Sequence, residues 1–251
     1  MKISVQLYSL REEINKEGFG AVLSGLKAAD IDGVETVADN YGLAPQKFAA
    51  LLNKYGLCAT GSHTGLAGLK NRAATLERSK ALGIKSHIIP WLSPEELKAE
   101  FPGKTGNGGK PGLLAGINAE IAFYNASGIT IGYHNHAHEF DGGADYIADL
   151  LNGAPGLKFE PDIFWLAAAG KSATAYIKPY AKRLIAIHLK ELAKGGIKEP
   201  NPFFGEGASE IKQCVALAKK LKLECVVIEM EGIAVPWRDY VAKAAEYIRN
   251  D

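Results

Sequence analysis

The stretch Ala126-Ser127-Gly128-Ile129-Thr130-Ile131 joins the end of a helix-like segment to the start of a strand-like one. A glycine just past a helix adopts the left-handed conformation that turns the chain back toward a strand. A similar phrase recurs at residues 54–60, 81–84 and 154–159, and segments with helical spacing of apolar residues lie between these points. The sequence therefore predicts helices that alternate with strands along the whole chain.

This alternation predicts eight short, mostly apolar strands, at residues 3–8, 33–37, 57–63, 86–91, 129–134, 157–162, 183–188 and 224–229. Such strands are typical of a parallel sheet that helices cover. Eight units in 251 residues match the size of a TIM barrel, so we expect an α/β fold with a single (β/α)8 barrel domain over residues 1–251. A doubly wound sheet is the alternative, but no glycine-rich phosphate fingerprint follows the first strand.

Composition and charge exclude several classes of function. The chain is 47% hydrophobic, and its 29 basic and 28 acidic residues give a net charge of +1, which does not favour nucleic acid as a partner. Its apolar stretches are too short to cross a membrane. The N-terminus begins as a strand rather than a signal peptide, and Cys58, Cys214 and Cys225 lack metal-binding spacing. We expect a cytoplasmic protein with buried, reduced cysteines that acts on a small molecule; whether it forms a homo-oligomer is open.

The residues that end the predicted strands are mostly ionisable or aromatic: Tyr8, Glu35, His63, Trp91, His134, Asp162, His188 and Glu229. Side chains alternate along a strand, so the residues two and four positions earlier should fill the barrel. This alternation predicts that the following side chains point into the barrel: Thr130, Gly132, Leu184, Ala186, Cys225 and Val227. It predicts that these point toward the helices: Ile129, Ile131, Tyr133, Ile185, Ile187, Val226 and Ile228.

The last four predicted strands end in His134, Asp162, His188 and Glu229, which form a constellation rather than isolated charges. Ionisable groups that converge on an apolar barrel are costly unless something neutralises them. One divalent cation held by two imidazoles and two carboxylates does so and leaves coordination positions for substrate oxygens. Imidazole ligands favour manganese, zinc or cobalt over magnesium. The alternative is a metal-free network of ion pairs among the same residues.

Four motifs carry a resemblance to a known family: Gly132 to Phe140 (GYHNHAHEF), Asp162-Ile163-Phe164-Trp165, His188-Leu189-Lys190 and Phe204-Gly205-Glu206-Gly207. Over the whole chain the sequence resembles the xylose-isomerase-like barrel superfamily, in the branch described as sugar phosphate isomerase/epimerase. The resemblance implies a metal-dependent enzyme that works on a small carbohydrate.

Two departures from the superfamily pattern bear on the reaction. Ketose 3-epimerases of this superfamily bind their metal through Glu, Asp, His and Glu, whereas this chain has His134 in the first position. The change puts symmetric epimerisation by two glutamates in doubt, and His134, His136 or Glu139 would have to replace the lost carboxylate. Endonuclease IV needs many histidine ligands, and this chain has only six histidines and Trp165 where a histidine is common, so DNA repair is not expected.

The resulting hypothesis is a metal-dependent sugar isomerase or epimerase. Glu229 removes a proton next to a carbonyl, with His136 or Glu139 on the other face of a metal-stabilised enediolate. Lys190 is expected to bind a substrate oxygen or to protonate a leaving group. The other expected substrate-binding residues are Tyr8, Glu35, His63, Trp91 and Trp165.

Two further functions are kept as alternatives. One is a dehydratase or lyase that acts on a keto-sugar or keto-inositol by β-elimination. The other is a barrel that binds sugar without turnover. No arginine-rich or glycine-rich phosphate clamp is visible, which favours a substrate without phosphate.

Two long loops are expected on the active face, because each follows a predicted strand. They span residues 92–111 and 190–207. Loops of this length on that face often serve as lids or bind substrate. For residues 92–111 a plain surface insertion is the alternative.

Overall fold

Eight parallel strands form the centre of the computed structural model, which describes residues 1–102 and 112–250. The strands are β1 (Lys2–Gln6), β2 (Gly33–Val37), β3 (Cys58–His63), β4 (Ser86–Ile89), β5 (Thr130–His134), β6 (Lys158–Glu160), β7 (His188–Leu189) and β8 (Cys225–Ile228). They pair in the order β6-β5-β4-β3-β2-β1-β8-β7. Isolated bridges from Phe159 to Leu184 and from Asp162 to His188 join the two ends of this sheet. The predicted (β/α)8 barrel is confirmed.

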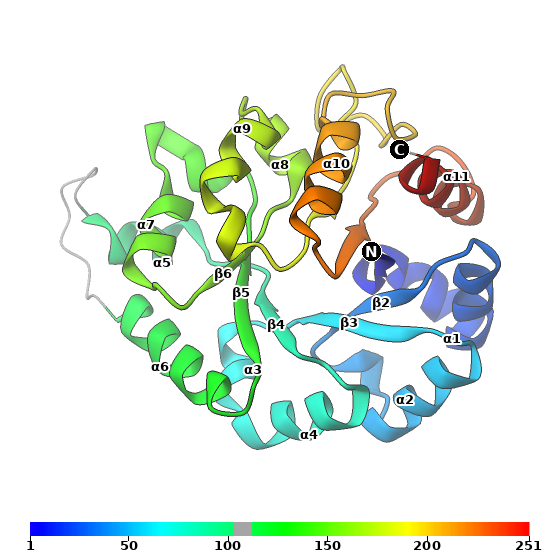
Figure 1. The fold of residues 1–251 in the computed structure, drawn as a ribbon, viewed down its shortest axis with the longest axis horizontal. Helices are drawn as coiled ribbons and strands as arrows, with labels where there is room; N and C mark the ends of the chain where they lie inside the picture. Colours follow the sequence, from blue (N-terminus) through cyan, green and yellow to red (C-terminus); the bar gives the residue numbers. More distant parts are fainter. Residues whose placement is uncertain (103–111, 251) are drawn as a thin grey trace.

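Helices form a ring around the strands (Figure 1). They are α1 (Arg11–Ala28), α2 (Pro45–Lys54), α3 (Leu66–Lys70), α4 (Arg72–Leu82), α5 (Pro94–Glu100), α6 (Leu113–Asn125), α7 (Tyr146–Gly153), α8 (Ile163–Ala168), α9 (Ala173–Ile177), α10 (Ile211–Leu221) and α11 (Trp237–Asn250). The first and last helices pack together, because Glu17 of α1 accepts hydrogen bonds from the side chains of Trp237 and Arg238. None of the described helices is long and apolar enough to cross a membrane.

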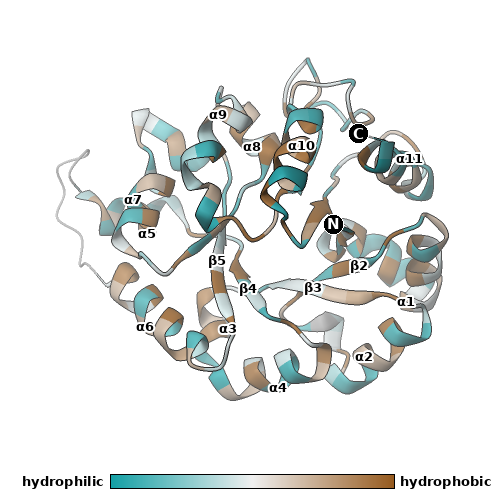
Figure 2. Ribbon diagram, in the orientation of Figure 1, coloured by the Kyte–Doolittle hydropathy of each residue, from teal (hydrophilic) through white to brown (hydrophobic). Residues whose placement is uncertain are grey.

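The main hydrophobic core lies between the strands and the helices rather than inside the barrel. Hydrophobic and hydrophilic residues alternate along the outer helices (Figure 2), as expected for helices with one face on a core. Ile131 and Tyr133 belong to this outer core, as parity predicts, while Ala186, Cys225 and Val227 form a separate small cluster inside. The barrel interior is therefore lined by small and polar side chains, and this leaves room for ionisable groups.

The seventh strand departs from the prediction. It spans only His188–Leu189, and residues 183–187 contact the sheet through one bridge at Leu184 and single backbone hydrogen bonds at Ile185 and Ile187. The predicted inward Leu184 packs in the outer core, whereas Ile185 lies against Gly132. The prediction was wrong at these two positions because strict alternation requires a regular strand, and this segment is irregular up to Ala186.

The two long loops follow β4 and β7 as expected. Glu191 anchors the second one, because its carboxylate accepts the backbone N–H groups of Gly205 and Ser209. In the first, Ser93 and Glu96 form a capping box that begins α5. Residues 103–111 of that loop lie outside the described residues. Cys58, Cys214 and Cys225 are free thiols, and the latter two are buried.

Candidate active site

The four predicted metal ligands converge at the carboxyl end of the barrel. One ligand atom from each of His134, Asp162, His188 and Glu229 lies within 4.8 Å of the others, and all four side chains are buried. His134 and Glu229 line a mouth cavity of about 340 Å³. This convergence follows from parallel strands, whose carboxyl ends meet on one face of the barrel.

Asp162 is held so that one carboxylate oxygen points into the site. It is the N-cap of α8, and its Oδ1 accepts the backbone N–H groups of Phe164 at 2.8 Å and Trp165 at 3.3 Å. The amide of Asn135 also bonds the backbone of Asp162 and ties β5 to it. Oδ2 is buried and has no hydrogen-bond partner among the described residues. An orphaned carboxylate oxygen of this kind suits a cation.

The two imidazoles also suit a common cation. The ring planes of His134 and His188 cross at 72°, with 4.6 Å between centroids. A ligand nitrogen binds along its lone pair, in the plane of its ring, so crossing planes share a line on which a metal ion can lie. Nε2 of His134 lies 3.8 Å from Oδ2 of Asp162, and in the described part of the chain Nδ1, 4.0 Å from Glu160 Oε2, has no hydrogen-bond partner. The donor set of two nitrogens and two carboxylates fits manganese, zinc or cobalt.

Protonation in this centre is governed by burial and by neighbouring charges. Burial lowers the pKa of His188, but Glu160 and Glu35 together raise it well above its usual value. Burial and the charge of Glu229 raise the pKa of Asp162 to about 7. Burial likewise works to raise the pKa of Glu229, yet the cation of Lys190 and the hydrogen bond from His188 hold it well below its usual range. Glu229 is thus the ionised carboxylate of the mouth at neutral pH.

Lys190 is fully buried at the side of this centre. Its Nζ lies 3.3 Å from Glu229 Oε1 and 2.6 Å from Glu231 Oε2. It also lies over the rings of Phe164 and Trp165. The expected inward orientation is observed, although Lys190 is engaged by two carboxylates and does not line the mouth cavity.

A second layer of ionisable groups lies beneath the four candidate metal ligands. Glu35 was expected at the mouth, but it sits in the middle of β2 and is buried, where Gln6, His63 and His188 donate to its Oε2. Glu35 lies too deep in the barrel to reach the mouth. Val37, two residues later on the same face of the strand, lines the cavity instead.

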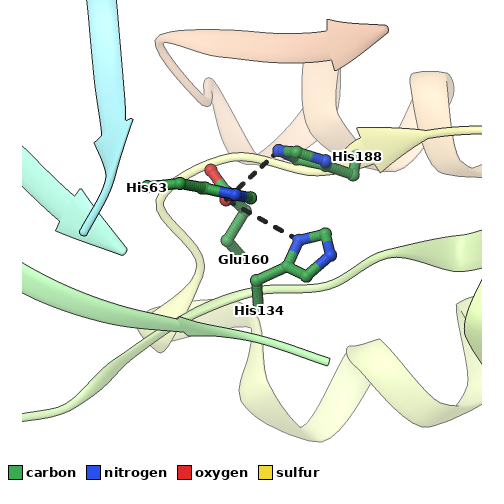
Figure 3. A group of neighbouring side chains, drawn as sticks. All are labelled: His63, His134, Glu160 and His188. Carbon is green, nitrogen blue, oxygen red and sulfur yellow. Dashed lines mark hydrogen bonds and ion pairs between the residues drawn. The ribbon is translucent and has the colours of Figure 1, made fainter. Parts of the chain in front are cut away.

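Glu160 was missed by the sequence reasoning. Its carboxylate lies among the rings of His63, His134 and His188 (Figure 3), with Oε2 3.2 Å from Nε2 of both His63 and His188. Glu160 shares its strand face with Asp162, two residues later, so the alternation of side chains could have revealed it.

Figure 3 draws the group formed by His63, His134, Glu160 and His188. Its geometry suits hydrogen bonding better than metal binding. The rings of His63 and His188 are stacked, with an interplanar angle of 8° and 5.2 Å between centroids. Nearly parallel, offset rings cannot both direct an in-plane lone pair at one cation. Burial lowers the pKa of His63, but Glu35 and Glu160 raise it to about 9, so His63 is a cationic hydrogen-bond donor to these carboxylates.

Aromatic side chains surround the mouth. Tyr8, Trp91 and Trp165 line the cavity together with His63 and His136. Tyr8 is 51% exposed and Trp91 is 50% exposed. Tyr8 lies in the 3-10 helix η1 (Leu7–Leu10) and Trp91 follows β4, so both stand beyond the strands that were predicted to end with them. Flat apolar surface of this kind suits a sugar ring.

The two remaining candidates lie in the segment after β5. The ring of His136 lines the cavity between Trp91 and Trp165. Glu139 is fully buried and turned away from it: Tyr133 donates to Oε1 at 2.5 Å and the backbone N–H of His136 donates to Oε2 at 2.9 Å. The structure therefore brings His136 to the mouth and places Glu139 behind it.

Comparison with known proteins defines the class. The chain belongs to the xylose isomerase-like TIM barrel family, whose model matches residues 23–251. No curated protein sequence matches it.

Solved structures share the fold at low sequence identity. A sugar phosphate isomerase/epimerase from Parabacteroides distasonis is 19% identical, with a TM-score of 0.79 and coverage of 100% of this chain and 99% of that one. The probable 3-DHS dehydratase AsbF from Bacillus anthracis is 11% identical, with a TM-score of 0.75 and coverage of 100% and 99%. The IolI protein with a bound zinc atom is 12% identical, with a TM-score of 0.69 and coverage of 100% and 96%.

Proposed function

We propose that this chain is a metal-dependent enzyme that isomerises or epimerises a small keto-sugar. The observation that carries the proposal is the convergence of His134, Asp162, His188 and Glu229 at the mouth cavity, with an unpartnered Asp162 oxygen among them. The zinc atom in the IolI structure is consistent with a metal in such a barrel.

A bound divalent ion would supply Lewis-acid polarisation of a substrate carbonyl. Glu229 would then take the proton from the adjacent carbon, because it is ionised and lines the cavity. Lys190, against Glu229 Oε1, keeps that carboxylate charged. His136 is the candidate donor on the other face. Burial lowers its pKa to about 3, so at neutral pH it is a neutral imidazole that would donate a hydrogen bond to a substrate oxygen through its N–H.

The cavity lining favours a neutral substrate. Among the described residues, no lysine or arginine lines the mouth, whereas two carboxylates, Glu229 and Glu231, do. A phosphate group would meet these two carboxylates without a lysine or arginine to pair with it. Tyr8, Trp91 and Trp165 would pack on the sugar ring, and His63 would bind a hydroxyl group.

A dehydratase or lyase is the second candidate function, for one specific reason. Across the barrel from β8, the strand β5 presents His134 where symmetric epimerisation needs a carboxylate, and Glu139 is turned onto Tyr133. A base at Glu229 with an imidazole donor also fits loss of a β-hydroxyl group as water. The fold shared with the probable dehydratase AsbF is consistent with such chemistry.

Metal content is the first test. We would measure bound metal by mass spectrometry in the wild type and in an Asp162→Ala/His188→Ala double variant. We expect the variant to lose about one equivalent of metal, and no metal in either protein after dialysis against manganese and zinc would overturn the proposal.

Incubation with a panel of keto-sugars in deuterated buffer then distinguishes the possible reactions. Deuterium uptake without loss of mass indicates an isomerase or epimerase, loss of water indicates a dehydratase, and neither indicates a binding protein.

A further inference from the structure

A second cluster of metal-ligating side chains lies beside the mouth, in the segment that follows β5. One ligand atom from each of His136, His138 and Glu139 lies within 4.8 Å of the others. The group shares no residue with the four candidate ligands described above. Trp91 covers it, with its ring 4.8 Å from that of His136 and 4.3 Å from that of His138, centroid to centroid.

Hydrogen bonds assign the protons of His138. Its Nε2 lies 2.9 Å from the backbone oxygen of Leu92. A carbonyl oxygen only accepts, so Nε2 carries a hydrogen, and Nδ1 is the nitrogen left for a cation. Nδ1 lies 3.6 Å from Oε2 of Glu139. Nδ1 of His138 thus faces a carboxylate oxygen.

The oxygens of Glu139 are held in place from behind. Tyr133 donates its hydroxyl hydrogen to Oε1, and the backbone N–H of His136 donates to Oε2. These bonds fix the carboxylate beside His138 without placing a proton between them. The ligand Glu139 would therefore be oriented before any cation arrives.

Two buried nitrogens of the cluster have no hydrogen-bond partner within the described residues: Nδ1 of His136 and Nδ1 of His138. Unpaired buried acceptors are rare and unfavourable. One nitrogen of each ring and a carboxylate oxygen lie within 4.8 Å of one another, so a single cation could bind all three.

We propose that His136, His138 and Glu139 form a second metal site, selective for a divalent transition-metal ion. Two imidazoles and one carboxylate are a donor set that zinc accepts, with a further position open to water. The surroundings match those of metal-bound histidines, which donate their other N–H to a carbonyl or carboxylate, as His138 does to Leu92.

This site has a consequence for catalysis, and that part rests on the proposed function. The ring of His136 lines the mouth cavity. With a cation on Nδ1, the hydrogen of the neutral ring stays on Nε2, and His136 becomes a fixed hydrogen-bond donor. The second ion would thus select the tautomer in which His136 can donate a hydrogen bond to the substrate.

Zinc stoichiometry tests the proposal on the full chain. Each protein is stripped with chelator, dialysed against zinc and analysed by mass spectrometry. We expect about two equivalents in the wild type and about one in His138→Gln, whose amide still can donate to Leu92. His87→Gln is the matched control, because both ring nitrogens of the buried His87 already have hydroxyl partners, and it should keep about two. Equal zinc in His138→Gln and the wild type would overturn the site.

A second variant keeps the outcome distinct from failure of the proposed function. The Asp162→Ala/His188→Ala protein should keep about one equivalent, and adding His138→Gln to it should remove that one. If His138→Gln fails to fold by circular dichroism, anomalous diffraction at the zinc edge on wild-type crystals decides. A peak among the three side chains supports the site, and a peak only at Asp162 and His188 refutes it.

Discussion

Glu35 accepts a hydrogen bond from His188, with 2.7 Å between Oε2 and Nε2. The other nitrogen, Nδ1, lies 2.6 Å from Glu229 Oε2. Because Glu35 retains the hydrogen on Nε2, Nδ1 is the nitrogen left for a cation shared with Glu229. A carboxylate behind a metal-binding histidine fixes both its tautomer and its orientation.

Glu35→Gln should therefore weaken metal binding although Glu35 does not face the mouth. Loss of such a supporting carboxylate lowers metal affinity about 10- to 100-fold. Calorimetric titration of metal-free protein with manganese measures the effect. Glu120→Gln is the control, because Glu120 is also buried but pairs with Arg72 on the helix layer. Unchanged affinity in Glu35→Gln would remove Glu35 from the support of the site.

Trp91→Ala should raise KM for the active keto-sugar while changing kcat little. Half of the Trp91 surface is exposed at the cavity, and stacking of an aromatic ring contributes about 1 kcal/mol, or roughly a five- to tenfold change in affinity. Trp91→Phe should keep most of the binding. Steady-state kinetics of the three proteins checks this, and equal KM values would show that Trp91 does not contact the substrate.

His87 should make stability depend on pH. Its Nδ1 bonds Thr64 and its Nε2 bonds Ser79, and burial, aided by the charge of Arg78, lowers its pKa to about 3 from the usual 6.5. Below pH 6.5 the His87 ring takes up a proton in the unfolded chain but stays neutral in the folded chain. The free energy of unfolding therefore falls as the pH drops from 6.5 toward 3.

Comparison with a His87→Gln variant isolates this effect. By pH 5 the His87 contribution should have fallen by roughly 2 kcal/mol. Urea unfolding at pH 7 and pH 5 should show the wild type losing more stability than His87→Gln over this interval. Identical losses in the two proteins would contradict a neutral, buried His87.

Gly33→Ala should destabilise the barrel. A Cβ at this position in β2 would lie 2.6 Å from the backbone oxygen of Cys58 in β3, and backbone cannot move as a side chain can. Overpacking of this kind costs about 1–3 kcal/mol. Gly116→Ala in α6 is the opposite case, because no described atom lies within 4 Å of the new Cβ, and it should stabilise the helix by about 0.5–1 kcal/mol. Urea unfolding compares the two; equal stability of Gly33→Ala and wild type would show that β2 and β3 relax freely.

Local pattern predicted much of the site. His134, Asp162, His188 and Glu229 were found because each closes an apolar segment that was predicted as a strand, and strand ends of a parallel barrel share one face. Glu160 was missed because only the last residue of each predicted strand was considered. Glu160 lies two residues earlier on the same strand face, one layer deeper in the barrel. Glu35 was identified but placed one layer too high for the same reason.

The alternation of helices and strands, and the inward face of regular strands such as β5 and β8, follow from periodicity and helix-ending glycines, which act between near neighbours in the chain. Periodicity does not predict how deep a side chain lies in the barrel. Nor does it predict the irregular segment before β7 or which nitrogen of each histidine faces the site. They depend on partners such as Glu35 and His188, which are 153 positions apart. Only closure of the barrel brings such groups within hydrogen-bonding distance, so tertiary structure alone decides which lone pairs face a cation.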